Sequence, residues 1–136
     1  LGAPHYLIQS TLSGVVAQRL VRTLCPHCKT ESALDVHGWD ALVHRWKLPP
    51  PPRAFAPVGC QECRNTGFLG RTGIYEMMRI SPNLRQMIQP SLDLARLGET
   101  ALAEGMRPLR VSAAPQVARG LTTIAEVVGV LPPIET

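Results

Sequence analysis

Aromatic residues are scarce in this sequence, since only 4% of its 136 residues are Phe, Trp or Tyr. A folded core must therefore be mainly aliphatic, and the hydrophobic content of 45% argues against wholesale disorder. No apolar run approaches the ~20 residues that a membrane-spanning helix needs. The first residues lack both a start methionine and a signal-peptide pattern. We therefore expect this chain to be a piece of a longer one.

Familiar catalytic motifs are missing as well. The sequence contains neither the G-x4-G-K-[ST] phosphate loop nor the H-E-x-x-H zinc-protease helix. Its histidines are scattered, at His5, His27, His37 and His44. The residues therefore predict no catalytic centre within this chain.

The cysteines, in contrast, are strictly arranged. Four of them form two C-x2-C pairs, Cys25 with Cys28 and Cys60 with Cys63, and 31 residues separate the pairs. Two such turns supply the four thiolates of a tetrahedral zinc site, and a closed shell of this kind leaves no place for a catalytic water. The pattern therefore predicts a structural metal site, with His27 pointing away from the metal. Iron remains an alternative to zinc.

Two other functions fit the cysteines less well. A nucleic-acid-binding zinc ribbon agrees with the net charge of +4, but the long insertion and the lack of aromatics among the basic residues count against it. Thiol–disulfide exchange at Cys25-Pro26-His27-Cys28 is conceivable. We expect a helix to end at Cys25, however, and the negative end of a helix disfavours a reactive thiolate. The absence of a secretion signal also favours metal over disulfides.

The apolar pattern predicts several helices. Leu12, Val16, Leu20 and Leu24 recur every fourth residue, which predicts a helix from about residue 10 to 24 with Gln18, Arg19 and Arg22 on another arc. Val36, Trp39, Val43 and Trp46 predict a helix and a small satellite core inside the insertion. The prolines at 49–52 then predict an extended surface loop.

The second half of the sequence predicts one strand and a helical tail. Residues 74–80 have the composition of a strand, and Ser81-Pro82 begins a helix with inward Leu84, Met87 and Ile88. A helix over about 92–104, with inward Leu94, Leu97 and Ala101, ends at Gly105. Another follows Pro108, with apolar Val111 and Val117, and stops at Gly120. A capping box, Thr123 to Glu126, opens the last one. The predicted fold class is α+β, mostly helical, built around the tetracysteine module.

Several segments together resemble one known family. They are Ala17–Lys29, Gly59–Cys63, Thr66–Phe68, Gly70–Glu76, Glu104–Arg107, Gly120–Thr123 and Glu126–Val128. In this combination they are similar to the C-terminal part of the type II secretion ATPase and of the related type IV pilus assembly ATPase. The sequence departs from that family at the prolines of 49–52 and at Ser112–Pro115.

The resemblance implies a function for the parent protein. It implies a hexameric cytoplasmic motor on the inner membrane that hydrolyses ATP with Mg²⁺ and contacts neighbouring subunits and membrane platform proteins, with no nucleic acid expected. It also implies three segments: residues 1–24 as the edge of a RecA-like ATPase domain, 25–80 as the metal module with its insertion at 30–58, and 81–136 as a helical subdomain.

The family's nucleotide-binding motifs would lie upstream, so we expect this piece alone not to hydrolyse ATP. Gln18, Arg19 and Arg22 are candidates for contact with the nucleotide or with a neighbouring subunit. The alternative is a solvated helix face without a partner.

Overall fold

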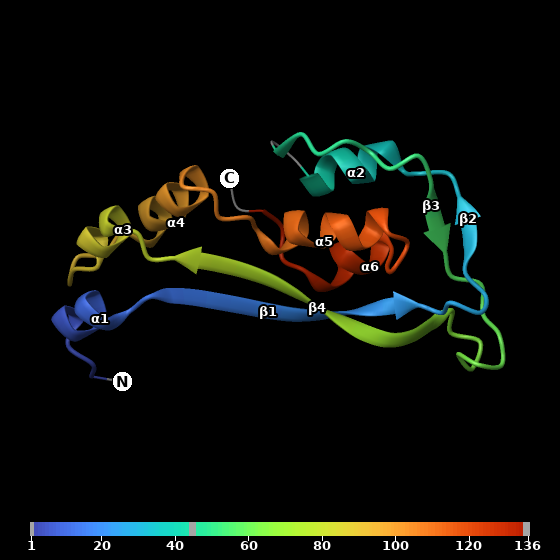
Figure 1. The fold of residues 1–136 in the computed structure, drawn as a ribbon, viewed down its shortest axis with the longest axis horizontal. Helices are drawn as coiled ribbons and strands as arrows, with labels where there is room; N and C mark the ends of the chain where they lie inside the picture. The colour runs from blue at the N-terminus through green and yellow to red at the C-terminus, as the bar shows by residue number, and fades with distance from the viewer. Residues whose placement is uncertain (1, 44–45, 135–136) are drawn as a thin grey trace. The chain divides into compact units, whose positions relative to one another are not determined.

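The computed structural model describes residues 2–43 and 46–134. Figure 1 shows the order of its helices and strands. The chain forms two compact units, which we describe in turn. Unit 1 comprises Leu1–Ala17 and Glu76–Pro108, and unit 2 comprises Gln18–Tyr75 and Leu109–Thr136. The predicted segments 1–24, 25–80 and 81–136 concern the parent protein and stay a prediction.

The longest elements are two paired strands, β1 (Gly14–Leu24) and β4 (Phe68–Arg79), which form a two-stranded sheet. The helix predicted up to residue 24 is therefore wrong. A spacing of four also places residues on one face of a strand, because four is a multiple of the strand period of two. In β1 the buried residues are instead Val21 and Leu24, whereas Val16 and Leu20 are 56% and 44% exposed.

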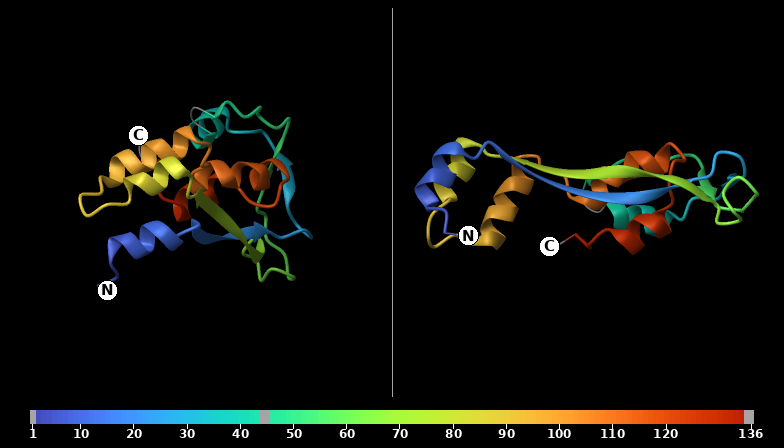
Figure 2. Two further views of the ribbon diagram at one scale, coloured as in Figure 1. Left: turned by 60° about the vertical axis from the view of Figure 1, so that its left-hand side comes forward. Right: turned by 90° about the horizontal axis from the view of Figure 1, so that it is seen from below.

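Unit 2 has one hydrophobic core. The helices α2 (Val36–Val43), α5 (Leu109–Ala118) and α6 (Ile124–Val130) pack with the parts of β1 and β4 that belong to this unit, as Figures 1 and 2 show. Trp39 is buried in the same cluster as Val21, Ile74 and Val117. The prediction of a separate satellite core is therefore wrong, and the insertion is an integral part of this unit.

The insertion also contains a short antiparallel pair of strands, β2 (Thr30–Ser32) and β3 (Ala54–Ala56). Thr30 lies opposite Ala56 in this pair. The prolines at 49–52 lie in an irregular segment between α2 and β3, as predicted. His44 lies outside the described residues.

Unit 1 contains α1 (His5–Thr11), α3 (Pro82–Met87) and α4 (Leu94–Ala103). Its core consists of Ile80, Leu84, Ile88 and Ala101, with Leu12, Met78, Met87, Leu97 and Met106 packed against them. The Ser81 hydroxyl accepts a hydrogen bond from the Leu84 N–H, which confirms the predicted start of α3. Gly105, with φ +105°, follows α4 as predicted.

One inward position in this unit was predicted wrongly. Leu94 is 73% exposed. It is the first residue of α4, and helical side chains point back toward the N-terminus. Its side chain therefore extends past the end of the helix instead of joining the buried stripe.

The last two helices begin where the sequence predicts. Helix α5 follows Pro108, and both Val111 and Val117 are buried. The Thr123 hydroxyl accepts a hydrogen bond from the Glu126 N–H and so caps α6. The predicted capping box would also direct the Glu126 carboxylate back to the cap. That carboxylate instead binds an arginine of β1, described below.

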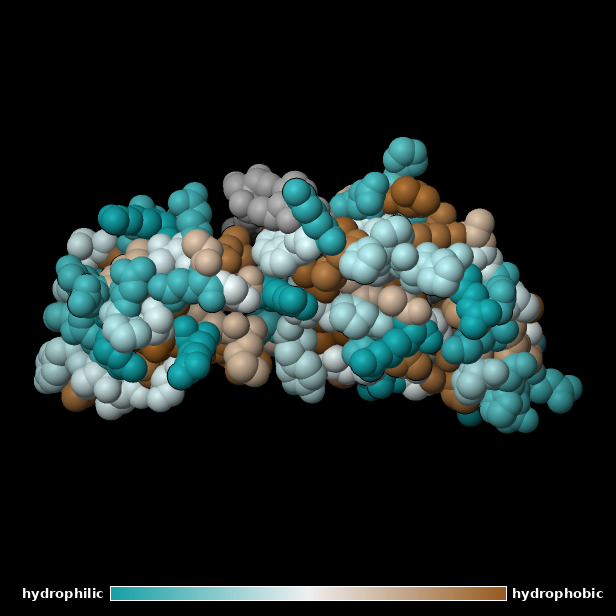
Figure 3. Space-filling model, turned by 45° about the horizontal axis from the view of Figure 1, so that its top comes forward, coloured by the Kyte–Doolittle hydropathy of each residue, from teal (hydrophilic) through white to brown (hydrophobic). Residues whose placement is uncertain are grey.

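No helix in the described part of the chain is both long and apolar enough to cross a membrane. The face shown in Figure 3 carries hydrophilic and hydrophobic residues interspersed with one another.

Candidate metal centre

Two tight turns bring the cysteines together in unit 2. Cys25 directly follows β1, and Cys60 and Cys63 lie in the turns that lead into β4. The Cys25 N–H donates to the Gly67 carbonyl at 2.9 Å, which joins the first turn to the segment after the second. The Lys29 N–H closes the first turn on the Cys25 carbonyl, and the Asn65 N–H closes the second on the Cys60 carbonyl.

The four sulfur atoms lie at the separations that a tetrahedral ion requires. All four lie within 4.8 Å of one another. The Cys25–Cys60 and Cys28–Cys63 sulfurs are 3.8 Å apart, and the Cys60–Cys63 sulfurs are 3.7 Å apart. Sulfurs ~2.3 Å from a central zinc ion would stand about 3.8 Å apart at the corners of a regular tetrahedron.

The same distances exclude a disulfide, whose sulfurs are ~2.05 Å apart, and all four cysteines are free. The residues present therefore fit a four-thiolate metal ion, as the sequence predicts.

Backbone N–H groups surround the sulfurs. The Gly59 N–H donates to Cys28 Sγ at 3.3 Å, and the N–H groups of Cys60 and Gly67 each donate to Cys63 Sγ at 3.2 Å. Both glycines have positive φ, and a Cβ atom on Gly67 would stand 2.4 Å from the Pro57 side chain. Glycine is therefore required for the backbone to approach the sulfur this closely.

The surroundings shift the pKa values of two of the thiols, Cys25 and Cys63, in opposite directions. Burial raises the pKa of Cys25 to about 11. Burial alone would also raise the pKa of Cys63, but hydrogen bonds from the backbone N–H groups of Cys60 and Gly67 outweigh it and lower that pKa to about 6. Metal ligation requires all four thiolates, so binding to this set would release protons and depend on pH.

His27, which lies inside the first cysteine turn, is not part of the sulfur cluster. The His27 side chain is exposed and contributes no ligand atom.

The helix-end argument against thiol–disulfide exchange is wrong, because Cys25 follows a strand rather than the negative end of a helix. What distinguishes this site from a dithiol pair is that each sulfur has a neighbour from the other turn.

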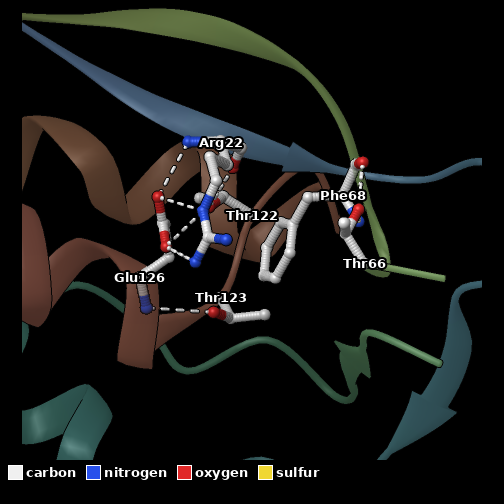
Figure 4. A network of polar contacts seen from close by, with 6 residues as sticks. All are labelled: Arg22, Thr66, Phe68, Thr122, Thr123 and Glu126. Carbon is white, nitrogen blue, oxygen red and sulfur yellow. Dashed lines mark hydrogen bonds and ion pairs between the residues drawn. The ribbon is translucent and has the colours of Figure 1, made fainter. Parts of the chain in front are cut away.

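Arg22 lies at the centre of a polar network, drawn in Figure 4. Its backbone N–H donates to Glu126 Oε1 at 3.0 Å, and its guanidinium donates to both carboxylate oxygens, at 2.7 Å from Nη2 to Oε2. Its Cζ atom lies 4.2 Å from the centre of the Phe68 ring. This pair fixes β1 against α6, and the alternative of a solvated helix face without a partner is wrong for Arg22.

Glu126 is only 8% exposed, so its charge depends on this partner. The hydrogen bonds from the Arg22 side chain hold the pKa of Glu126 below its usual range, although burial by itself raises it. From the sequence alone, the only structural role expected of Glu126 is in the capping box at the start of α6. Nothing in the sequence pattern relates it to an arginine 104 positions away.

The other two candidates lie elsewhere on β1. Gln18 Nε2 donates to Tyr75 Oη at 3.3 Å, and Arg19 Nη1 donates to the Gln18 carbonyl at 2.9 Å. Both side chains are exposed. Alternation along a strand places Gln18 and Arg22 on one face and Arg19 on the other. The structure does not therefore gather the three residues into one site.

Comparison with known proteins defines the class. The family described as type II/IV secretion system protein matches residues 1–129. The chain therefore belongs to this family, in agreement with the resemblance found in the sequence.

Individual relatives come from both branches of the family. The chain is 42% identical over 132 residues to the type IV pilus assembly ATPase TfpB of Acinetobacter baylyi, covering 97% of the chain and 23% of the relative. It is 34% identical over 134 residues to the type II secretion system protein E of Aeromonas hydrophila, covering 96% and 25%. It also matches the type II secretion system ATPase E of Vibrio cholerae at 34% identity, covering 96% and 25%. The chain thus spans about a quarter of the length of these relatives.

Proposed function

We propose that this chain is the non-catalytic C-terminal part of a motor ATPase that powers assembly of a pilus or a pseudopilus for protein export. The observation that carries the proposal is the four-sulfur cluster within a chain that matches the secretion family over residues 1–129. The cluster has no open ligand position, so its role in such a motor is architectural.

We assign zinc to the cluster as its structural ion, because four thiolates in a tetrahedral arrangement suit zinc, with iron the alternative. Bound there, the ion would supply a rigid cross-link. Cys25 and Cys28 hold the end of β1, and Cys60 and Cys63 hold the segment before β4. The insertion between the pairs is thereby closed at its base.

At the level of the parent protein, the proposal is a homohexamer that binds ATP and Mg²⁺ in its upstream part. It lies in the cytoplasm, peripheral to the inner membrane, and contacts membrane platform proteins and neighbouring subunits. Gln18, Arg19 and Arg22 remain candidates for nucleotide or subunit contacts. For Arg22, the half of the side chain that stays exposed (54%) is the part available for such a contact.

Nucleic-acid binding by a zinc ribbon is the other candidate function. Single-stranded nucleic acid is held by basic grooves with aromatic rings on which bases stack. In unit 2 the chain's own cations lie over both phenylalanine rings: Arg22 lies over Phe68, and Lys29 and Arg53 lie over Phe55. This arrangement favours the motor over the ribbon.

The gene sequence, ATPase assays and a nucleic-acid-binding assay test the proposal together. The gene that encodes this chain should encode a G-x4-G-K-[ST] loop upstream, the purified chain should not hydrolyse ATP, and the full-length protein should. A gene without that loop would overturn the motor assignment. Steeply salt-dependent binding to RNA or DNA, tighter than binding to heparin, would favour the ribbon instead.

A further inference from the structure

The turn between α5 and α6, residues 119–123, is held by residues that flank the metal ligands. We call it the α5–α6 turn. Leu24, directly before Cys25, donates its N–H to the Leu121 carbonyl at 2.8 Å. Thr122, only 1% exposed, donates its hydroxyl to the Arg22 carbonyl at 2.9 Å. The end of β1 that carries the first metal ligand is therefore bonded to this turn at two points.

A second set of contacts comes from the other side of the first cysteine pair. Lys29, directly after Cys28, donates from Nζ to the Gly120 carbonyl at 2.8 Å. The same ammonium lies 4.9 Å from the centre of the Phe55 ring. Phe55 belongs to β3, the strand that leads to the second cysteine pair.

Position 120 has no space for a side chain. Its φ is +70°, and a Cβ atom there would lie 2.5 Å from Cδ2 of Phe55. A side chain at 120 would therefore displace the ring, or the turn, or both. The arrangement leaves the turn packed directly on the insertion, with no room between them.

We propose that the α5–α6 turn is a latch coupled to the metal centre: metal bound at the cysteines orders the turn and the start of α6, and an intact turn tightens metal binding. The proposal rests on the metal centre proposed above. Leu24 and Lys29 are each one residue from a ligand, so fixing the ligands positions the Leu24 N–H and the backbone from which the Lys29 side chain reaches Gly120. Thermodynamic linkage then requires the effect to be reciprocal.

The latch gives the metal a role beyond closing the insertion. Helix α6 carries Glu126, which binds Arg22 of β1, so ordering of the turn also presents Glu126 to its partner. The metal centre, the α5–α6 turn and the start of α6 therefore become ordered or disordered together. Lys29 and Phe55, which contact the turn, and Gly120, which lies in it, act as positioning residues, because none of them is a metal ligand.

The first test measures zinc affinity of the chain by competition with a chromophoric chelator. Gly120→Ala should weaken zinc binding about tenfold, within the range typical of coupled sites. Gly105→Ala is the matched control, because Gly105 also has positive φ, at +105°, but a Cβ atom there would meet nothing within 4 Å. It should change zinc affinity about twofold or less. Equal affinities for the Gly120→Ala variant and the unmodified chain would overturn the latch.

A second variant keeps the proposal testable if Gly120→Ala does not fold. Lys29→Met retains the aliphatic stem and removes the Nζ donor, and it should also weaken zinc binding, by about fivefold. Lys47→Met removes the same charge from an exposed position of the loop after α2 and serves as its control. Identical affinities for these two variants would contradict the coupling.

The effect of the metal on the α5–α6 turn is measured by hydrogen exchange in the unmodified chain. Chelation of the metal should speed exchange in residues 119–127 and leave α4 (Leu94–Ala103) of unit 1 nearly unchanged. An equal rise in α4 would mean general loosening, and no rise in 119–127 would mean no coupling, so either result refutes the latch. A chain that binds neither zinc nor iron would refute the metal centre itself, whereas one that binds either metal with unaltered exchange would refute the latch alone.

Discussion

Replacement of Trp39 by alanine tests whether the insertion belongs to the main core of unit 2. Trp39 is 2% exposed and packs in one cluster with Val21 of β1 and Ile74 of β4. Truncation of a buried Trp to Ala typically costs about 3–5 kcal/mol of unfolding free energy. The indole also donates from Nε1 to the Leu48 carbonyl at 3.2 Å, a bond worth about 1 kcal/mol. Against a total stability of roughly 5–15 kcal/mol, this is a large fraction.

The assay must separate loss of the insertion from loss of the whole unit. We expect Trp39→Ala to lower the free energy of unfolding in denaturant and to speed exchange of the Val21 amide, which lies in β1 and not in the insertion. Trp39→Phe keeps most of the buried apolar surface and should lose about 1–2 kcal/mol. Val36→Ala, at a 55% exposed position of the same helix, should stay within about 0.5 kcal/mol of the unmodified chain. Unaltered protection of Val21 in Trp39→Ala would show that the insertion has its own satellite core after all.

Cys60→Ser leaves three sulfur ligands and should lower both the metal content and the midpoint of thermal unfolding; a variant that keeps both would count against a structural metal site. The lowered pKa of Glu126 means that its contribution to stability is present above the ordinary glutamate pKa and is lost as the pH falls through the lowered folded-state value. The stability difference between the unmodified chain and Glu126→Gln, measured from pH 7 to pH 3, should therefore shrink in acid. A difference that stays constant down to pH 3 would contradict the role of the Arg22 pair. Asp93 accepts hydrogen bonds at the start of α4, so Asp93→Ala should destabilise unit 1 by about 1 kcal/mol, while exposed Glu99→Ala should not.

The metal cluster and the helix caps could be predicted from the sequence, because residues close together in the chain determine them. The identical spacing of the cysteine pairs is enough to predict that four thiols share one site, and the structure brings their sulfurs within 4.8 Å. Ser81 and Thr123 each bond to the N–H three residues on, so the sequence contains the whole cap.

Strand β1 shows where such signals are ambiguous. A spacing of four residues between Leu12, Val16, Leu20 and Leu24 fits one face of a helix and one face of a strand. The β-branched residues of this stretch favour the strand, and pairing with β4 determines the outcome. Composition in this case is more informative than periodicity.

Long-range contacts could not be predicted at all. Arg22 and Glu126 are separated by 104 positions, and Lys29 and Gly120 by 91. The fold brings β1 beside α6, and the residues after β1 beside the α5–α6 turn, and no local pattern specifies either arrangement. The same holds for Trp39, whose helical spacing predicts burial but not the core in which it is buried.

The central claim is that four thiolates hold one structural ion, and elemental analysis of the purified chain with parallel titration of its free thiols tests it most directly. We predict about one zinc per chain, with the thiols protected until a chelator is added. Iron in the same stoichiometry would preserve the architecture and change the ion. A metal-free chain with four reactive thiols, or with two disulfides, would contradict the claim.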